Sequence, residues 1–485
     1  MSIKFGTSGW RAVIADTFTF SNVRKAALGI AGYVKAHPLR RKSPPTVVIG
    51  YDTRFNSREF ALSAAKVLAS NGVKVLFTER DAPTPVISYQ VINNGAEGAI
   101  NITASHNPPE YNGLKFSPYH GGPAAPEVTK EIERRVAGIK GEVIEPPASK
   151  LKYPIQEFDP RPEYFTRIKE LINLPAIKKA GLKVIVDVMH GTGRGYLDRI
   201  LEESGCEVEV LNENLDPLFG GHPPEPAKDN IGKLISEIKK RRADLGLALD
   251  GDADRFGIVD EKGRFYTPDE VIALLFKHLI ETRPRLSQVA RTHSTTTLID
   301  RIAKRYNIKV VETPIGFKYI GEVLMGGRCI IGGEESGGLS IANHVPEKDG
   351  ILACLLVAEM VAVKGQKLSR ILEDIYREFG KSYPGKLNVK LADEQKSRLL
   401  TLLEKHPPRN IVGLKVAKSD KKDGYKFILA DSSWVLIRPS GTEPLIRFHF
   451  EGITSGKHKK LLNYCKALIK SVRSPVDVAR PPEED

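Results

Sequence analysis

Short apolar runs alternate along the chain with longer stretches of helical periodicity. The run Thr46–Gly50 precedes a helical stretch at Ser57–Ser70, and Leu182–Val188 precedes another near Tyr196–Ser204. A strand covered by helices on both faces is apolar throughout, whereas a half-exposed strand alternates polar and apolar residues. The pattern therefore predicts an α/β fold in which parallel or mixed sheets lie between layers of helices.

The α/β pattern falls into three blocks, and its character changes after Tyr383-Pro384-Gly385. Beyond that point a helix near Lys457–Ser471 follows four strand-like runs, at Val412–Val416, Lys426–Leu429, Val435–Ile437 and Ile446–Phe450. A chain of 485 residues has room for several domains of about 150 residues each. We expect α/β domains at residues 1–150, 151–260 and 261–380 and a smaller α+β domain at residues 381–475.

The charge balance allows more than one class of partner. Hydrophobic residues make up 41% and charged residues 27%, which is ordinary for a globular protein, but the net charge is +14. Such a charge suits a nucleic acid or an anionic substrate. The basic clusters, such as Lys239–Arg242, are short, scattered and not interleaved with aromatic residues. Solvated helix and loop faces therefore explain them best, and binding to nucleic acid is a lesser alternative.

The sequence shows no sign of export or of a membrane anchor. Its first residues contain no apolar leader segment, and Glu359 interrupts the longest apolar stretch, Ile351–Val363. That stretch is shorter than the roughly 20 residues of a spanning helix. The four cysteines lie far apart, without a CxxC pair. We expect a cytoplasmic protein with no membrane partner.

A serine and a histidine adjoin in the segment Thr103–Pro109, directly after the predicted strand Ala99–Thr103. The carboxyl end of a parallel strand is where α/β proteins place functional residues. Neighbouring side chains on extended chain point to opposite sides, so we expect His106 to be poorly placed to deprotonate Ser105. With no GxSxG motif present, a covalently carried group on Ser105 is favoured over a hydrolase triad. A polar turn that only caps the strand is the alternative.

Three aspartates, Asp250, Asp252 and Asp254, occupy alternate positions at the end of another predicted strand. On extended chain they would face one side, and curvature at Gly251 would let them converge. Clustered carboxylates repel one another unless a cation neutralises them, and oxygen ligands suit Mg²⁺. Arg255 stands where an EF-hand requires glycine, so we expect a metal loop of another kind, with a solvated acidic turn as the alternative.

Two further segments place polar side chains among glycines. In Gly332–Gly338, Glu334 and Ser336 offer acceptors and a donor suited to neighbouring sugar hydroxyls. In Arg438–Pro444, an arginine, two hydroxyls and a glycine offer donors for a dianionic phosphate. Each segment alone could equally be a tight turn. The sequence contains neither a GxxxxGK[ST] nor a GxGxxG motif, which disfavours a nucleotide triphosphatase and a dinucleotide dehydrogenase.

Taken together, the four segments resemble the hallmark motifs of the α-D-phosphohexomutase family, which includes phosphoglucomutases and phosphomannomutases. They are TASHNP at 103–108, DGDADR at 250–255, GEESGG at 333–338 and RPSGTEP at 438–444. The segments Phe5–Arg11, Asn112–Lys115 and Thr313–Lys318 fit the family as well, and the resemblance runs from about Ile3 to Ser471. It implies a heart-shaped, four-domain enzyme with three mixed α/β sandwich domains and a smaller C-terminal α+β domain.

By this resemblance, Ser105 is similar to the phosphoserine of the family. It would donate its phosphoryl group to a hexose monophosphate and recover one from a hexose 1,6-bisphosphate intermediate. The metal ligands would be Ser105, Asp250, Asp252 and Asp254, and Mg²⁺ would withdraw charge from the phosphoryl group during transfer. The implied cofactors are Mg²⁺ and glucose 1,6-bisphosphate or mannose 1,6-bisphosphate. The implied partners are hexose phosphates, with no nucleic acid.

The resemblance implies roles for further residues. Lys115 would act as a general acid and base near the sugar hydroxyl. Arg11 and Arg255 would stabilise charge around the phosphoserine and Lys115. The residues expected to bind substrate are Glu334 and Ser336 at the sugar, Arg438, Ser440, Gly441 and Thr442 at the distal phosphate, and Lys318. His293 stands near a position where some relatives have a lysine, and we assign it no role.

The sugar is less clearly indicated than the reaction. Glu335 stands where the amino-sugar branch often has glutamine, whereas Gly338 departs from the histidine common in the bifunctional bacterial type. We expect an isomerase that interconverts the 1-phosphate and 6-phosphate of glucose, mannose or both. The same chemistry on a glucosamine or N-acetylglucosamine phosphate is the alternative. A non-catalytic sugar-phosphate binding protein is an alternative of a different class.

Overall fold

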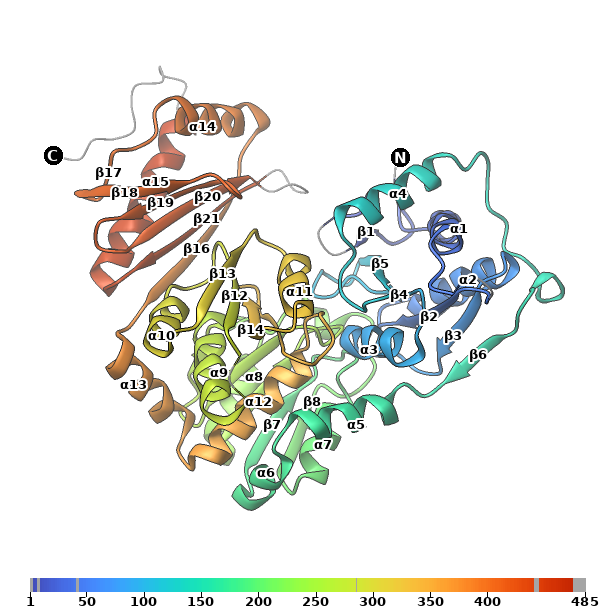
Figure 1. The fold of residues 1–485 in the computed structure, drawn as a ribbon, viewed down its shortest axis with the longest axis horizontal. Coiled ribbons are helices and arrows are strands. Elements are labelled where there is room, and N and C mark those ends of the chain that lie inside the picture. Colours follow the sequence, from blue (N-terminus) through green and yellow to red (C-terminus); the bar gives the residue numbers. More distant parts are fainter. Residues whose placement is uncertain (1–2, 7–8, 41–42, 285, 440–444, 474–485) are drawn as a thin grey trace. The chain divides into compact units, whose positions relative to one another are not determined.

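A computed structural model describes the chain except residues 1–2, 7–8, 41–42, 285, 440–444 and 474–485 (Figure 1). The chain forms two compact units. Unit 1 comprises Met1–Ala290 and Gly316–Glu373, and unit 2 comprises Arg291–Ile315 and Asp374–Asp485. Each unit is described by itself below.

The first sheet of unit 1 is mixed. Its strands lie in the order β1 (Trp10–Val13), β5 (Tyr111–Pro118), β4 (Gly98–Ile102), β2 (Thr46–Tyr51), β3 (Lys74–Thr78) and β6 (Ile155–Phe158). Strands β4, β2, β3 and β6 are parallel to one another. Strand β5 runs antiparallel to both of its neighbours, β4 and β1. The helices of this part are α1 (Phe20–Ala36), α2 (Ser57–Ser70), α3 (Thr84–Asn94) and α4 (Pro126–Ala137).

Strand β2 shows why this sequence forms a buried strand. Val47 and Ile49 lie in the hydrophobic cluster that includes side chains of α1 and α2. Val48 points to the other face and packs in a second cluster with Ile87 and Val91 of α3. Both faces of the strand are therefore covered, as its unbroken apolar run predicts.

The second sheet of unit 1 is also mixed. Its order is β11 (Phe265–Tyr266), β10 (Phe256–Asp260), β9 (Leu245–Leu249), β7 (Lys183–Asp187) and β8 (Glu207–Leu211). Strand β7 is parallel to β8 and β9, whereas β9 and β10 form an antiparallel hairpin. The helices are α5 (Arg161–Leu171), α6 (Leu174–Ala180), α7 (Leu197–Glu203) and α8 (Gly232–Arg241). The hairpin turn between β9 and β10 carries the three aspartates.

The remainder of unit 1 contains a second hairpin and three helices. Strands β14 (Cys329–Glu334) and β15 (Gly338–Ile341) pair antiparallel, and the helices are α9 (Pro268–Thr282), α11 (Phe317–Met325) and α12 (Gly350–Lys364). The apolar stretch noted at Ile351–Val363 forms most of α12, which is buried from Gly350 to Val361. Among the helices of the described ranges, none is long and apolar enough to cross a membrane.

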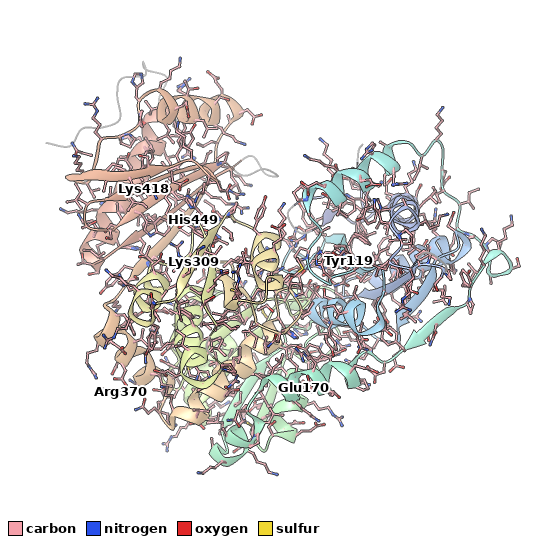
Figure 2. The ribbon with its side chains drawn as sticks, in the orientation of Figure 1. Tyr119, Glu170, Lys309, Arg370, Lys418 and His449 are labelled. Carbon is pink, nitrogen blue, oxygen red and sulfur yellow. The ribbon has the colours of Figure 1, made fainter. Side chains whose placement is uncertain are left out.

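Unit 2 contains an antiparallel sheet, on which Lys418 and His449 are labelled in Figure 2. Its order is β16 (Tyr383–Lys390), β21 (Leu445–Gly452), β20 (Trp434–Pro439), β19 (Tyr425–Leu429), β18 (Leu414–Asp420) and β17 (Asn410–Ile411). The unit also holds β13 (Lys309–Thr313), α10 (Leu298–Tyr306), α14 (Asp393–Lys405) and α15 (Ser455–Arg473). Strand β12 (Gln288–Thr292) and helix α13 (Leu368–Phe379) run across the chain boundaries of the units.

The predicted α/β fold with a smaller α+β part near the C-terminus is confirmed by these sheets. One strand boundary was wrong. The sequence predicts a strand over Val412–Val416, but β18 begins at Leu414. Val412 and Gly413 have left-handed φ angles of 47° and 75° and form the turn between β17 and β18. A glycine adopts this conformation readily. A valine in a turn looks the same in the apolar pattern as a valine in a strand, so the pattern did not reveal the turn.

Candidate active site

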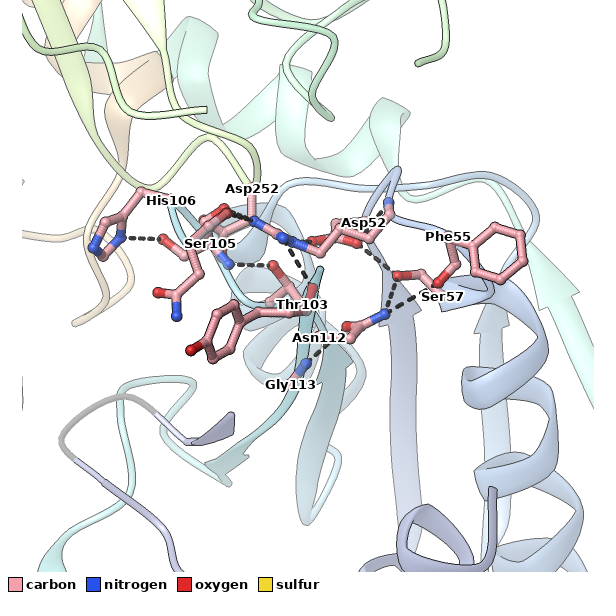
Figure 3. Close-up of polar contacts among 12 residues, drawn as sticks. Asp52, Phe55, Ser57, Thr103, Ser105, His106, Asn112, Gly113 and Asp252 are labelled. Atoms are coloured by element: carbon pink, nitrogen blue, oxygen red, sulfur yellow. Dashed lines mark hydrogen bonds and ion pairs between the residues drawn. The ribbon is translucent and has the colours of Figure 1, made fainter. Parts of the chain in front are cut away.

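Ser105 lies just beyond β4, in a turn that the rest of unit 1 encloses. Its side chain is buried, and its Oγ donates a hydrogen bond of 2.8 Å to Asp250 Oδ2. The Ser105 N–H donates to Thr103 Oγ1 at 2.8 Å, which fixes the start of the turn (Figure 3). The backbone of Ser105 is left-handed, with φ at 54°. The serine loop and the aspartate loop, far apart in sequence, therefore meet at one hydroxyl group.

The expectation that His106 points away from Ser105 was wrong. His106 Nδ1 lies 3.3 Å from Ser105 Oγ. The left-handed φ of Ser105 turns the chain, so the two neighbouring side chains do not alternate as they would on extended backbone. Burial, together with the charges of Arg255 and Arg11, lowers the pKa of His106 well below its usual value. The ring is therefore neutral near pH 7 and is a weak base toward the Ser105 hydroxyl.

The three aspartates converge through a hairpin turn rather than along extended chain. One carboxylate oxygen from each of Asp250, Asp252 and Asp254 lies within 4.8 Å of the others. The left-handed residue of the turn is Ala253, with φ at 54°, rather than Gly251. Gly251 serves a different need: a Cβ there would lie 2.7 Å from the carbonyl oxygen of Ser105. The glycine thus permits the close approach of the two loops.

The carboxylates are arranged to hold a cation. Burial and the charges of Asp252 and Asp254 raise the pKa of Asp250 well above its usual value. Asp252 Oδ1 and Asp254 Oδ1 are buried, and neither has a hydrogen-bond partner among the described residues. Buried carboxylate oxygens without donors are costly unless a cation binds them. The three side chains therefore fit a hard divalent cation with oxygen ligands.

Lys115 lies beside the same aspartates. It belongs to β5, whose antiparallel register pairs it with Asn101 of β4. Its Nζ is 2.6 Å from Asp252 Oδ2 and 2.9 Å from Asp254 Oδ2. Burial alone would lower the pKa of Lys115, but the two carboxylates raise it above its usual value. The ammonium group is therefore charged near neutral pH and carries a proton into the site.

Two residues of this cluster were not predicted from the sequence. Lys348 is buried, with Nζ 3.2 Å from Asp254 Oδ2 and 2.8 Å from Glu347 Oε1. Thr84, the first residue of α3, donates from Oγ1 to Asp252 Oδ2 at 2.5 Å and accepts from Asn101 Nδ2 at 2.7 Å. Lys348 follows an acidic residue in a loop, and Thr84 starts a helix, so neither stands out as chemistry in the sequence.

The two predicted arginines flank the cluster. Arg255 donates its backbone N–H to Asp250 Oδ1 at 2.9 Å, and its Nε lies 3.9 Å from Asp254 Oδ1. Arg11, on β1, donates to Asn107 Oδ1 at 2.7 Å, next to the serine turn. Burial, followed by the charge of Arg255, lowers the pKa of Arg11. Positive charge is thus concentrated around Ser105.

The predicted sugar contacts lie in the β14–β15 hairpin. Ser336 Oγ donates to Glu334 Oε1 at 2.6 Å. Burial raises the pKa of Glu334, while the charges of Lys348 and Arg255 oppose that rise. Glu334 thus shares the electrostatic environment of the aspartates. Lys318 lies in α11 with Nζ 5.0 Å from the centre of the Tyr319 ring, and its part in substrate binding stays a prediction.

In unit 2, Arg438 is the penultimate residue of strand β20, and its guanidinium is held in place. Its Nε donates to Asp423 Oδ1 at 2.7 Å, and Asp423 Oδ2 accepts from the Ile315 N–H at 2.8 Å. The arginine is therefore tied to the Thr313–Lys318 segment that the resemblance also singled out. The other predicted phosphate contacts, Ser440, Gly441 and Thr442, lie outside the described residues.

His293, to which we assigned no role, also lies in unit 2. Its Nδ1 is 2.8 Å from Glu312 Oε1, and a carboxylate oxygen of Asp420 lies within 4.8 Å of that pair. Glu312 already accepts from Arg291 at 2.6 Å and from Lys426 at 3.3 Å. These two cations neutralise Glu312, so the approach of His293 to that carboxylate is explained without a metal ion.

Comparison with known proteins identifies the family. Four family models of phosphoglucomutase/phosphomannomutase match the chain: the alpha/beta/alpha domains I, II and III at residues 2–142, 162–263 and 267–379, and the C-terminal domain at residues 387–463. The chain therefore belongs to the phosphoglucomutase/phosphomannomutase family, the α-D-phosphohexomutases. It has the four domains of that family and is an isomerase.

Similar proteins carry more than one substrate assignment. The phosphoglucomutase/phosphomannomutase of Thermococcus kodakarensis is 32% identical over 94% of this chain and 96% of its own length. A Methanopyrus kandleri protein assigned as a phosphoglucosamine mutase is 30% identical over 94% of this chain and 95% of its own. A Thermus thermophilus crystal structure assigned as a phosphomannomutase superposes with a TM-score of 0.84 at 33% identity, covering 97% of this chain and 100% of that one. A hexose-phosphate mutase activity is supported by all three.

Proposed function

We propose that the protein interconverts the 1-phosphate and 6-phosphate of glucose, mannose or both, and that Ser105 carries the transferred phosphoryl group. The observation that supports this most directly is the hydrogen bond from Ser105 Oγ to Asp250 in a buried cluster with Lys115. The four-domain division at about residues 150, 260 and 380 is part of the same proposal, since it places one motif in each domain.

The residues of the cluster can account for the proton transfers. When phosphoserine donates to a sugar hydroxyl, the serine P–O bond breaks and a sugar P–O bond forms. The sugar hydroxyl loses its proton in this step, and the Ser105 oxygen takes one up. When the bisphosphate returns a phosphoryl group to Ser105, the departing sugar oxygen needs a proton instead. Charged Lys115 is suited to give that proton and, once neutral, to take one in the opposite transfer. Asp250 Oδ2 accepts a hydrogen bond from the Ser105 hydroxyl, and His106 Nδ1 lies 3.3 Å from the same oxygen.

We further propose Mg²⁺ as the cation that the aspartates hold. Asp250, Asp252 and Asp254 would be its protein ligands, together with an oxygen on Ser105. When bound, it supplies positive charge that stabilises the transferring phosphoryl group. Arg11 and Arg255 add to that field. In the bound substrate, Glu334 and Ser336 would contact the sugar, and the segment from Arg438 to Thr442 would contact the distal phosphate. Lys318 would help to bind the substrate.

Two alternatives differ in what they predict. A phosphoglucosamine mutase would use the same cluster on an amino sugar, which some of the similar proteins suggest. A non-catalytic binding protein would have no use for a buried serine beside three aspartates and a lysine. A coupled assay with glucose 1-phosphate, mannose 1-phosphate and glucosamine 1-phosphate side by side distinguishes them. We expect turnover of the first, the second or both to exceed that of the third, and turnover of none would overturn the proposal.

A further inference from the structure

Arg54 follows the end of strand β2 by three residues, and its side chain is completely buried. All five N–H groups of its guanidinium have an acceptor. Nε donates to Asp52 Oδ2 at 3.1 Å. The other four N–H groups donate to the carbonyl oxygens of Ser105, Asn107, Pro108 and Tyr111, at 2.7, 2.6, 2.7 and 2.9 Å. One side chain thus donates hydrogen bonds to carbonyl groups along the serine loop, from Ser105 to Tyr111.

The four carbonyl groups that Arg54 binds lie at or next to the serine loop, where no helix or strand ladder of the described residues provides them with hydrogen-bond donors. The loop makes turns, with the Asn107 N–H bonded to the Ala104 carbonyl and the Tyr111 N–H to the Pro108 carbonyl. Its inward carbonyl groups would otherwise be buried without donors, at a cost of about 1–3 kcal/mol each. Each terminal nitrogen of Arg54 binds two of these carbonyl groups. The spacing of the carbonyl groups must therefore match the geometry of the guanidinium group.

Asp52 ties the same arginine to the other side of Ser105. It accepts from the Arg54 N–H at 3.0 Å and from Ser57 Oγ at 2.7 Å. It is also hydrogen-bonded to Thr103, whose Oγ1 accepts from the Ser105 N–H. Ser105 is therefore held at its N–H through Thr103 (Figure 3). Arg54 holds it at its carbonyl oxygen.

We propose that Arg54 is a positioning residue for phosphoryl transfer: it holds Ser105 in its left-handed conformation and so aims Oγ at Asp250 and the aspartate loop. The inference rests on the proposed function of Ser105. Arg54 does not touch the reacting atoms, and it makes no contact with the predicted sugar and phosphate residues among the described bonds. Its loss should therefore slow transfer without weakening substrate binding.

A lysine cannot replace this side chain. An ammonium group has three donors around one nitrogen, whereas the guanidinium spreads five donors in a plane over four carbonyl groups and a carboxylate. The face of the guanidinium is also covered by the Phe219 ring, whose centre is 4.9 Å from Cζ. A variant that keeps the charge but loses the planar fork should therefore fail to restore the loop.

Kinetics of Arg54→Lys and Arg54→Ala test the proposal. With glucose 1-phosphate and saturating glucose 1,6-bisphosphate, kcat should fall about 100-fold or more in both variants, since displacement of a reacting group by about 1 Å costs that much. KM should stay within about threefold. Guanidinium ions at millimolar concentration should restore part of the kcat of Arg54→Ala, and the same concentration of ammonium ions should not. An unchanged kcat, or rescue by ammonium as well, overturns the proposal.

The control is Arg283→Lys, which changes another arginine bonded to a buried carboxylate and a backbone carbonyl, those of Glu359 and Leu171. We expect a lower Tm but a kcat within about twofold of the wild type. A crystal structure of either Arg54 variant provides a test that needs no activity. Ser105 should leave the left-handed region, and an unchanged loop overturns the inference. Wild-type protein inactive on every hexose phosphate would refute the proposed function instead.

Discussion

Lys348 fills the space beside Gly338: a Cβ on Gly338 would lie 2.3 Å from Lys348 Cδ and 2.6 Å from its Cγ. The same lysine reaches Asp254 with its ammonium group. Position 338 is the one at which this chain departs from the histidine common in the bifunctional bacterial type. The glycine and the lysine thus pack directly against one another. Any larger residue at position 338 would require Lys348 to move.

Gly338→Ala should lower kcat/KM because the new methyl group displaces Lys348 from Asp254, at an overpacking cost of about 1–3 kcal/mol. Lys348→Ala should lower it for a related reason, the loss of the same ammonium group. In the double variant the two effects should not add, with a coupling energy of about 0.5–3 kcal/mol. Strictly additive losses in a double-mutant cycle would show that the two residues act independently.

Asp252→Asn should reduce turnover by several orders of magnitude while changing KM little. The substitution removes one carboxylate from the cation site and one partner of Lys115, and the charge stabilisation lost from the transition state amounts to several kcal/mol. Steady-state kinetics over a range of Mg²⁺ concentrations measures it. Asp159→Asn, which alters an aspartate paired with Arg161 away from the cluster, is the control. Full activity of wild type in excess chelator would count against the metal assignment.

Arg438→Ala should raise KM by removing a charge-assisted contact with the distal phosphate, worth about 1.5–3 kcal/mol. It should also release bisphosphate before the second transfer, so the variant should require more added glucose 1,6-bisphosphate. Initial rates at several concentrations of both compounds measure the two effects. Lys418→Ala, an exposed basic residue of the same sheet, should change neither. Unchanged kinetics of the arginine variant would refute its role.

Glu359→Gln should destabilise the protein at pH 7 and matter less in acid. Glu359, buried in α12, accepts from His278, Arg283 and the Asn173 N–H. Burial would raise the pKa of Glu359, but these donors hold it below its usual value. A carboxyl group with a lowered folded-state pKa adds stability above its unfolded pKa, about 4.3, and loses that contribution as the pH falls through the folded value.

Urea unfolding of wild type and Glu359→Gln from pH 7 to about pH 2.5 measures this difference. We expect the free energies of unfolding to differ by about 3 kcal/mol at pH 7, as for a broken buried ion pair. The gap should narrow below about pH 4.3. Glu281→Gln, which removes the partner of Lys277 and Lys364 nearer the surface, should cost no more than about 1 kcal/mol. A difference in free energy of unfolding that stays constant with pH would contradict the lowered pKa of Glu359.

Strand β2 and helix α2 could be predicted from the sequence because each carries its own pattern. Both faces of β2 are covered, so its residues are apolar throughout, and the predicted helix Ser57–Ser70 has the bounds of α2. The motif residues Ser105, Lys115 and the three aspartates were also found, since their identities and order carry the chemistry. The structure then brings them together in one cluster.

The conformation of the site could not be predicted in the same way. The contact between Ser105 and His106 depends on a left-handed φ at a residue that is not glycine, which no periodicity reveals. Arg54 and Lys348 act through partners 51 and 94 residues away along the chain. Arg54 did have one signal, because it follows a predicted strand at its carboxyl end. Its four acceptors are backbone carbonyl groups, which every residue has, so the sequence does not reveal them.

Transfer of phosphate through Ser105 is the central claim, and labelling tests it most directly. The protein is incubated with radiolabelled glucose 1,6-bisphosphate and Mg²⁺, and the label is located by peptide mapping before and after a chase with unlabelled glucose 1-phosphate. The account predicts label on the peptide that contains Ser105, its loss during the chase, and neither label nor turnover in Ser105→Ala. Stable label on another residue, together with wild-type turnover by Ser105→Ala, would contradict it.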